Sequence, residues 1–354
     1  MLIRFSEGTT MKTTRILVPD DFTDASREAV RYARMLAAGR NHELHLLHVV
    51  PDARHEPWAG AGAGDVNVDD LDLDGLTEDW VRDANIRLHR SACELQPTLN
   101  VHTEVRLGTA AEQIVAYAAE IQADLIVLGA HRDLRSAEWL RGSIAERVVR
   151  KASCAVLTVP GGGRDVPAID ETPAAREARE VREASGTGRQ PSIESILIPI
   201  DFSANSELAL TRGLALARER GAAVHVLYVY DPPWTRNAAY NAPPAHVTEE
   251  LRYRAERRLA RDIAHNHGPS LYVRAAVRVG DPYVEIVHYA GEIRTDLIVV
   301  GSHGRHTIGR SPLGSVAQKV LRRAPCPILT VHDESARAER FDITSLRTSS
   351  VMAG

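Results

Sequence analysis

The sequence has few cysteines and no long apolar run. Its three cysteines, Cys93, Cys154 and Cys326, form no Cys-x-x-Cys pair, which excludes a disulfide framework. No apolar stretch approaches the roughly 20 residues that span a bilayer. The N-terminal residues also lack the apolar core of a secretory signal. We therefore expect a cytoplasmic protein without a membrane partner.

An excess of charge of one sign is missing too. The chain has 43 Lys and Arg against 47 Asp and Glu, a net charge of −4. It therefore lacks the excess of basic residues that is typical of nucleic-acid-binding proteins. Its hydrophobic fraction of 44% is that of an ordinary globular protein. A length of 354 residues suggests two domains at about 150 residues each.

The sequence contains two copies of one unit. Residue 15 pairs with residue 195 and the alignment runs without a gap for the first part of each unit, whereas the later part aligns at an offset of 172. A repeat this long indicates two duplicated domains. Met11 is an alternative start to Met1. The expected segments are a flexible N-terminus (1–13), the first unit (14–160), a linker (161–193), the second unit (194–333) and a flexible tail (334–354).

Within each unit, short β-branched runs alternate with amphipathic stretches, which predicts a parallel, doubly wound α/β sheet. In the second unit the expected strands are 196–200, 224–229, 271–279, 297–300 and 327–331. The expected helices are 204–220, 247–267, one that starts at Asp281-Pro282 and one that starts at Ser315.

A glycine-rich segment lies between the fourth strand and the last helix of the second unit. Gly301-Ser302-His303-Gly304 leaves the strand, and Gly314-Ser315 opens the helix with Ser315 as the expected N-cap. Glycine lets the backbone approach phosphates, and a helix N-terminus offers free N–H groups. The segment therefore predicts a nucleotide-binding loop.

Other phosphate-loop motifs fit less well. Gly304-x4-Gly309-Arg310-Ser311 resembles a Walker A motif but has Arg310 in place of the lysine, and Pro312 interrupts the helix that should follow. No Gly-x-Gly-x-x-Gly follows an expected strand, and no Ser-Gly-Gly-x-Asp-Ser loop of adenylating PP-loop enzymes follows the first strand. An ordinary surface loop is the remaining alternative.

The spacing Gly-x2-Gly-x9-Gly-Ser resembles the ATP-binding signature of the universal stress protein family, and the resemblance covers essentially all of both units. It implies two tandem open, parallel five-stranded sheets of strand order 3-2-1-4-5 with helices on both faces, the adenine nucleotide alpha hydrolase-like fold. It also implies ATP as ligand. Any accompanying Mg²⁺ or Mn²⁺ is expected to bind through the phosphates.

By this resemblance, the second unit holds the nucleotide. Asp201 matches the adenine-contacting aspartate, Val229 matches the contact to the base, and the glycines and Ser315 match the ribose and triphosphate loop. A turn or N-cap role is the alternative for Asp201. The predicted ATP-binding residues are Pro199, Ile200, Asp201, Val229, Gly301, His303, Gly304, Gly314, Ser315 and Val316.

The first unit departs from the signature at one position, where Arg132 stands in place of Gly304. Arginine is costly there if the residue takes a positive φ or lets a phosphate approach the backbone. We therefore interpret the first unit as degenerate, with a structural or regulatory role. It keeps the remaining signature residues Asp21, Gly129, Gly142 and Ser143.

Three histidines, His42, His45 and His48, lie close together on the second expected strand. His45 and His48 point to opposite faces of a strand, and we expect no cysteine or acidic partner at ligand spacing. The sequence therefore predicts no metal site formed by protein side chains.

Three functions remain open. The first is a binding module whose ATP occupancy sets its conformation or partners. The second is an enzyme, either a slow ATPase or an autophosphorylating protein, although no Ser-His-Asp or Cys-His constellation is visible and no catalytic residue is assigned. The third is a scaffold that binds no nucleotide.

The last strands of the two units are sheet edges in the strand order 3-2-1-4-5. An apolar edge must be paired or covered, and family members commonly dimerise through this strand. We therefore predict that strands 155–159 and 327–331 bring the units together as an internal pseudo-dimer. A homodimer of whole chains is left open, and protein partners are unknown.

Overall fold

The expected N-terminal segment, most of the linker and the tail lie outside the residues that the structure describes. The computed structural model describes residues 14–38, 42–51, 73–96, 99–130, 144–161, 191–232, 245–266, 271–303 and 313–332. Within these ranges no helix is both long and apolar enough to cross a membrane.

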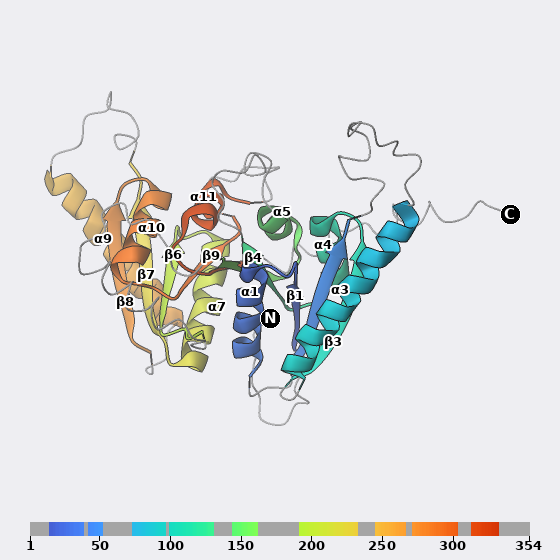
Figure 1. Cartoon of the computed structure of the whole chain (residues 1–354). Coiled ribbons are helices and arrows are strands. Elements are labelled where there is room, and N and C mark those ends of the chain that lie inside the picture. The colour runs from blue at the N-terminus through green and yellow to red at the C-terminus, as the bar shows by residue number, and fades with distance from the viewer. Residues whose placement is uncertain are drawn as a thin grey trace, which may run out of the picture.

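Each unit alternates strands and helices as expected (Figure 1). The first unit contains β1 (Thr14–Pro19), α1 (Asp24–Ala37), β2 (His42–Val50), α3 (Leu73–Leu95), β3 (Asn100–Leu107), α4 (Ala110–Glu120), β4 (Leu125–Ala130), α5 (Ile144–Lys151) and β5 (Ala155–Pro160). The second contains β6 (Ser195–Ile200), α7 (Ala204–Arg220), β7 (Ala223–Tyr230), α9 (Ala245–Asn266), β8 (Val273–Val279), α10 (Pro282–Glu292), β9 (Leu297–Gly301), α11 (Ser315–Arg323) and β10 (Ile328–Val331).

Local sequence signals set several helix ends. The Ser203 hydroxyl accepts a hydrogen bond from the Ser206 N–H at the start of α7, and Gly221 ends that helix in the left-handed conformation. Asp281 caps α10 ahead of Pro282. The expected N-cap Ser315 is wrong by one residue: the N-cap of α11 is Gly314, whose φ of −65° and ψ of 146° are extended, so Ser315 is the first helical residue.

The strands form a single sheet in the order β3-β2-β1-β4-β5-β10-β9-β6-β7-β8. Each half has the predicted order 3-2-1-4-5 with parallel neighbours. The two expected sheets are not separate, because β5 and β10 pair antiparallel with Leu157 opposite Leu329. Each unit thereby covers the apolar edge strand of the other.

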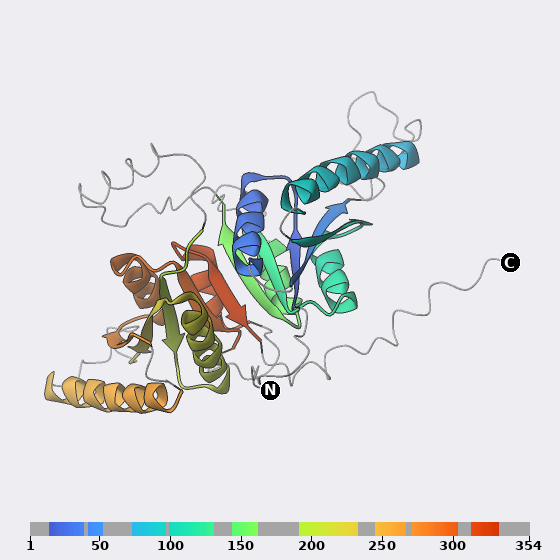
Figure 2. The same cartoon turned by 90° about the horizontal axis from the view of Figure 1, so that it is seen from below.

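Helices cover both faces of this sheet. Helices α1, α3, α7 and α9 pack on one face, where their buried residues share one apolar cluster with strands of both units. Helices α4 and α5 cover the opposite face in the first unit, and α10 and α11 cover it in the second. Figure 2 shows α3 and α9 at the two outer ends of the molecule.

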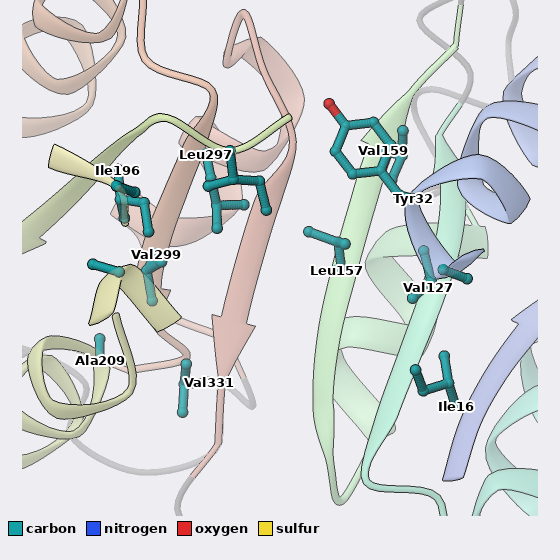
Figure 3. Close-up of a cluster of buried hydrophobic side chains, with 14 of the residues drawn as sticks. Ile16, Tyr32, Val127, Leu157, Val159, Ile196, Ala209, Leu297, Val299 and Val331 are labelled. Carbon is teal, nitrogen blue, oxygen red and sulfur yellow. The ribbon is translucent and has the colours of Figure 1, made fainter. Parts of the chain in front are cut away.

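The core is continuous across the seam between β5 and β10. Leu157 and Val159 from β5 belong to the same buried cluster as Val331 from β10 and Val299 from β9 (Figure 3). These side chains are almost fully buried, so the seam is stabilised by apolar burial as well as by backbone pairing.

A charged network joins the units on the opposite face. Glu146 of α5 is buried, with a side chain that is 4% exposed, and it pairs with Arg150 of its own helix at 2.8 Å. Arg322 of α11 reaches the same carboxylate with Nη2 at 2.7 Å and Nε at 3.1 Å, and the Gln318 amide also donates to it. Glu146 thus receives donors from both units.

Replacing Glu146 with alanine should lower the free energy of unfolding by about 2 kcal/mol. Breaking a buried pair commonly costs roughly 3–5 kcal/mol, but Arg150 and Arg322 are each about a third exposed and can regain water, which reduces the loss. Urea unfolding measures the change. Exposed Glu112, which lies 3.7 Å from Lys151 in the same unit, is the control, and Glu112→Ala should have little effect. Equal losses for both variants would contradict the prediction.

Candidate functional site

Most of the predicted ATP-binding residues that the structure describes lie where strands of the second unit end. Asp201 follows β6, Val229 is near the end of β7, and Gly301 ends β9. Because parallel strands end at one edge of the sheet, these residues lie at the edge where open α/β sheets bind ligands. Ser315 begins α11 after the glycine-rich loop, next to this edge.

The carboxylate of Asp201 is held in a tight turn. Its Oδ1 accepts from the Ser203 N–H at 3.0 Å and from the Ser203 hydroxyl at 2.6 Å. Oδ1 of Asp21 makes the same bonds with Thr23 in the first unit. The turn role that the sequence left open for Asp201 is therefore present, and it occurs in both units.

Aromatic residues next to these turns have left-handed backbones, with φ of 64° at Phe22 and 60° at Phe202. Arg87 lies over the Phe22 ring at 4.1 Å, and Arg258 lies over the Phe202 ring at 4.0 Å. In the first unit a hollow of about 280 Å³ opens beside this turn. Its lining residues are Asp21, Phe22, His48, Val50, Pro51, Trp80, Asp83, Ala84 and Arg87.

Gly301 is required by helix packing. A Cβ at this position would lie 2.6 Å from the backbone oxygen of Asn205 in the first turn of α7. A Cβ at Gly129 would similarly lie 2.5 Å from the backbone carbon of Ala25 in α1. Such contacts are too short for any side chain. The first glycine of the signature is therefore explained by packing in both units.

The two ends of the glycine-rich loop are joined by a backbone hydrogen bond. The N–H of Gly314 donates to the carbonyl oxygen of Ser302 at 2.8 Å, and the N–H of Ser302 donates to Val331 at 2.9 Å. His303 contacts the Ser302 hydroxyl through Nδ1 at 2.9 Å. The end of β9 therefore lies beside the first turn of α11, as a nucleotide loop requires.

Part of the predicted site lies outside the described residues. Gly304 of the second unit and Arg132, Gly142 and Ser143 of the first belong to this group. The contrast between Gly304 and Arg132 therefore stays a prediction.

The whole chain is similar to known proteins of one family. A family model described as the Universal stress protein family matches residues 12–160 and again residues 192–332. The chain belongs to the universal stress protein family. The two matches make it a tandem member, in agreement with the predicted family.

Individual universal stress proteins show the same relationship. A putative universal stress protein of Staphylococcus aureus strain USA300 is 31% identical over 149 residues, which cover 41% of this chain and 88% of that protein. The crystal structure of a universal stress protein from Archaeoglobus fulgidus DSM 4304 has a TM-score of 0.56 at 16% identity, covering 90% of this chain and 96% of that one. A putative universal stress protein from Pseudomonas aeruginosa UCBPP-PA14 has a TM-score of 0.55 at 16% identity, with coverage of 94% and 98%. At this identity the two structures show the fold.

The two universal stress protein units differ in charge at this edge of the sheet. Ile200, which ends β6, is replaced by Asp20 in the first unit. Asp20 is buried, and its Oδ1 accepts from the Phe22 N–H at 2.8 Å and the Ser26 hydroxyl at 2.7 Å. A second difference lies at the helix after the loop, since α5 carries Glu146 in its first turn whereas α11 has Gln318 there and no acidic residue in that turn. Only Asp20 is confined to the first unit, because the Glu146 carboxylate also contacts Gln318 in the first turn of α11.

The structure corrects one premise about the histidines. His45 has an acidic neighbour on its own face of β2, Glu43, and it pairs in register with His102 of β3. The spacing Glu43-x-His45 was a signal for this arrangement, since residues two apart on a strand share a face. The third member depends on strand register and was missed.

A histidine–tyrosine pair is common to both units. Nδ1 of His45 lies 3.1 Å from the hydroxyl oxygen of Tyr117, and Nδ1 of His225 lies 3.1 Å from that of Tyr289. Burial lowers the pKa of both histidines and raises the pKa of both tyrosines, because each charged form is poorly solvated there. Burial therefore favours the uncharged form of each imidazole.

Proposed function

We propose that this tandem universal stress protein binds one ATP in its second unit and acts as a nucleotide-dependent binding module. The observation that carries the proposal is the bond from Gly314 to Ser302, which places the end of β9 beside the N-terminus of α11. This arrangement presents helix N–H groups to a phosphate. The family signature supports ATP as the nucleotide.

The residues at this edge of the sheet suit the parts of ATP. Val229 is partly buried and provides apolar surface for a base, whereas the Ile200 side chain is buried in the core. The carboxylate of Asp201 can accept a hydrogen bond from the adenine amino group. The first turn of α11 carries no acidic side chain of its own, and the Glu146 carboxylate that contacts it is paired with Arg150 and Arg322. An accompanying Mg²⁺ or Mn²⁺ would bind through the phosphates.

The residue that follows the loop connects the proposed site to the first unit. Leu313, directly after the segment 304–312, is buried within the core cluster of the first unit. The helix that follows carries Gln318 and Arg322 to Glu146. We infer that the units form an internal pseudo-dimer, which the β5–β10 pairing supports, and that ATP acts on this contact.

Isothermal titration of the whole chain should detect one ATP site. Gly304→Arg should weaken it at least tenfold, because the side chain opens the loop or occupies the phosphate position. Each lost charge-assisted hydrogen bond removes roughly 1.5–3 kcal/mol. Ser143→Ala is the matched control in the first unit and should leave binding unchanged. Two equivalent sites, or a single site that survives Gly304→Arg, would contradict the proposal.

Asp201→Ala and Asp21→Ala form a second matched pair. Both changes remove the same turn, so both should lower the melting temperature by a similar amount. Only Asp201→Ala should lower ATP affinity and the preference for adenine over other bases. If both variants bind ATP like the wild type, Asp201 does not contact the nucleotide.

Turnover is expected to be negligible. The loop lacks the lysine and the acidic metal ligands on which P-loop catalysis depends. Phosphate release should stay far below the rates of about one per second or faster that are usual for enzymes. Hydrolysis at such rates that disappears in Ser315→Ala would favour the enzyme alternative.

A further inference from the structure

Three metal-binding side chains converge on the first unit, on the face of the sheet that α4 covers. Glu43 and His45 come from β2, and His102 comes from β3. Each offers one ligand atom, and these atoms all lie within 4.8 Å of one another. The His45 and His102 rings are stacked with centroids 4.7 Å apart. Strand alternation and the parallel register place all three on one face.

His45 is directed into this cluster by a buried partner. The residue is 8% exposed, and Tyr117 holds its Nδ1. Its Nε2 is also buried and has no hydrogen-bond partner among the residues that the structure describes. The nearest carboxylate oxygen, Glu43 Oε2, is 4.0 Å away. A buried nitrogen without a partner is unfavourable, and metal-binding histidines are typically held through the other ring nitrogen in this way.

The second unit provides an internal comparison. His225 makes the same contact with Tyr289. However, Ala223 stands where the first unit has Glu43, and Arg274 pairs with His225 where His102 pairs with His45. The histidine–tyrosine pair is therefore structural in both units. The carboxylate and the second imidazole are additions confined to the first unit.

We propose that Glu43, His45 and His102 bind one divalent transition metal ion, with zinc as the best match to two imidazoles and a carboxylate. Three protein ligands and a water complete a tetrahedral zinc site, in which neighbouring ligand atoms lie ~3.3 Å apart. His102 is exposed and can rotate to reach this spacing. Arg15 already contacts the Glu43 carboxylate, because its Nε donates to Oε2 at 3.0 Å. The metal ion therefore binds Oε1 of Glu43 or displaces the arginine from Oε2.

The site lies apart from the proposed ATP-binding residues, all of which belong to the second unit. Metal binding and ATP binding can therefore fail independently. Zn²⁺ titration without nucleotide, on the whole chain after chelator treatment, should show one stoichiometric binding step. Co²⁺ in its place should give the visible absorption of a four-coordinate ion.

His102→Arg places at this position the residue type that the second unit has at Arg274, and it should weaken Zn²⁺ binding at least tenfold. Glu43→Ala should weaken Zn²⁺ binding to the same extent. Melting in the presence of chelator should show that His102→Arg keeps the fold, since its position is exposed. His89→Ala is the control, because His89 lies 3.6 Å from the thiol of Cys93 and this exposed pair is another place for a metal. If stoichiometric Zn²⁺ binding is lost in His89→Ala but kept in His102→Arg, the proposal is wrong.

The converse experiment transfers the site. The double variant Ala223→Glu, Arg274→His supplies both missing ligands around His225 and should add a second Zn²⁺ per chain. A wild-type chain that binds no zinc more tightly than millimolar, or whose binding survives both His102→Arg and Glu43→Ala, would disprove the assignment.

Discussion

Gly301→Ala and Gly129→Ala should each lower the free energy of unfolding by about 3 kcal/mol, the upper part of the usual range for overpacking. In both cases the added Cβ meets backbone atoms of a facing helix at 2.5–2.6 Å. Backbone cannot rotate away as the end of a flexible side chain can, so a strand and a helix must separate. Urea unfolding measures both losses.

Comparing the two variants distinguishes an effect on packing from an effect on ATP binding, because Gly129 lies outside the proposed ATP site. Gly291 in α10 is the control, because nothing lies within 4 Å of a Cβ built there. Gly291→Ala should be neutral or stabilise by up to about 1 kcal/mol, as alanine is the better helix former. A Gly129→Ala variant as stable as the wild type would show that the close approach is not a constraint.

Leu329→Pro should destabilise the chain by about 3 kcal/mol or more and loosen the contact between the units. Leu329 lies in β10, between β9 and β5. It pairs with Val299 of β9 on one side and with Leu157 of β5 on the other. Proline removes a backbone donor and is confined to edge strands and bulges. In a helix interior the same loss costs about 3 kcal/mol, and β10 is paired on both sides. Urea unfolding together with X-ray scattering measures both effects.

Leu329→Ala is the matched control, because it shortens the same side chain but keeps the backbone N–H. It should unfold at a higher urea concentration than Leu329→Pro and keep the wild-type scattering profile. If the two variants have the same stability and the same scattering, backbone pairing at the seam does not hold the units together.

Helix bounds were predictable where the ends have local causes. The helix expected at 204–220 is found as Ala204–Arg220, because Ser203 and Gly221 mark its ends by side-chain capping and left-handed geometry. The start of α11 was misplaced by one residue because it depends on a distant contact. Gly314 donates to Ser302 across the loop, and its extended backbone precedes the helix.

Charged contacts between the units had no sequence signal. Glu146 and Arg322 are 176 residues apart, and nothing in either local pattern pairs them. The antiparallel meeting of β5 and β10 brings α5 and α11 together on one face. Glu146 has the local pattern of an ordinary helix residue and is buried because the two helices meet there.

The repeated unit, its alternating strands and helices, and the presence of a glycine-bounded segment could be predicted from the sequence, because each depends on residues close in the chain or on an internal alignment. Tertiary structure decided the rest. The two sheets are joined through the apolar strands β5 and β10. Glycine is required at position 301 because a Cβ there would meet the backbone of Asn205, and strand register sets His102 beside His45. The physical reason is common to all three: strand register and helix approach are set by packing between segments distant in sequence, which local periodicity does not encode.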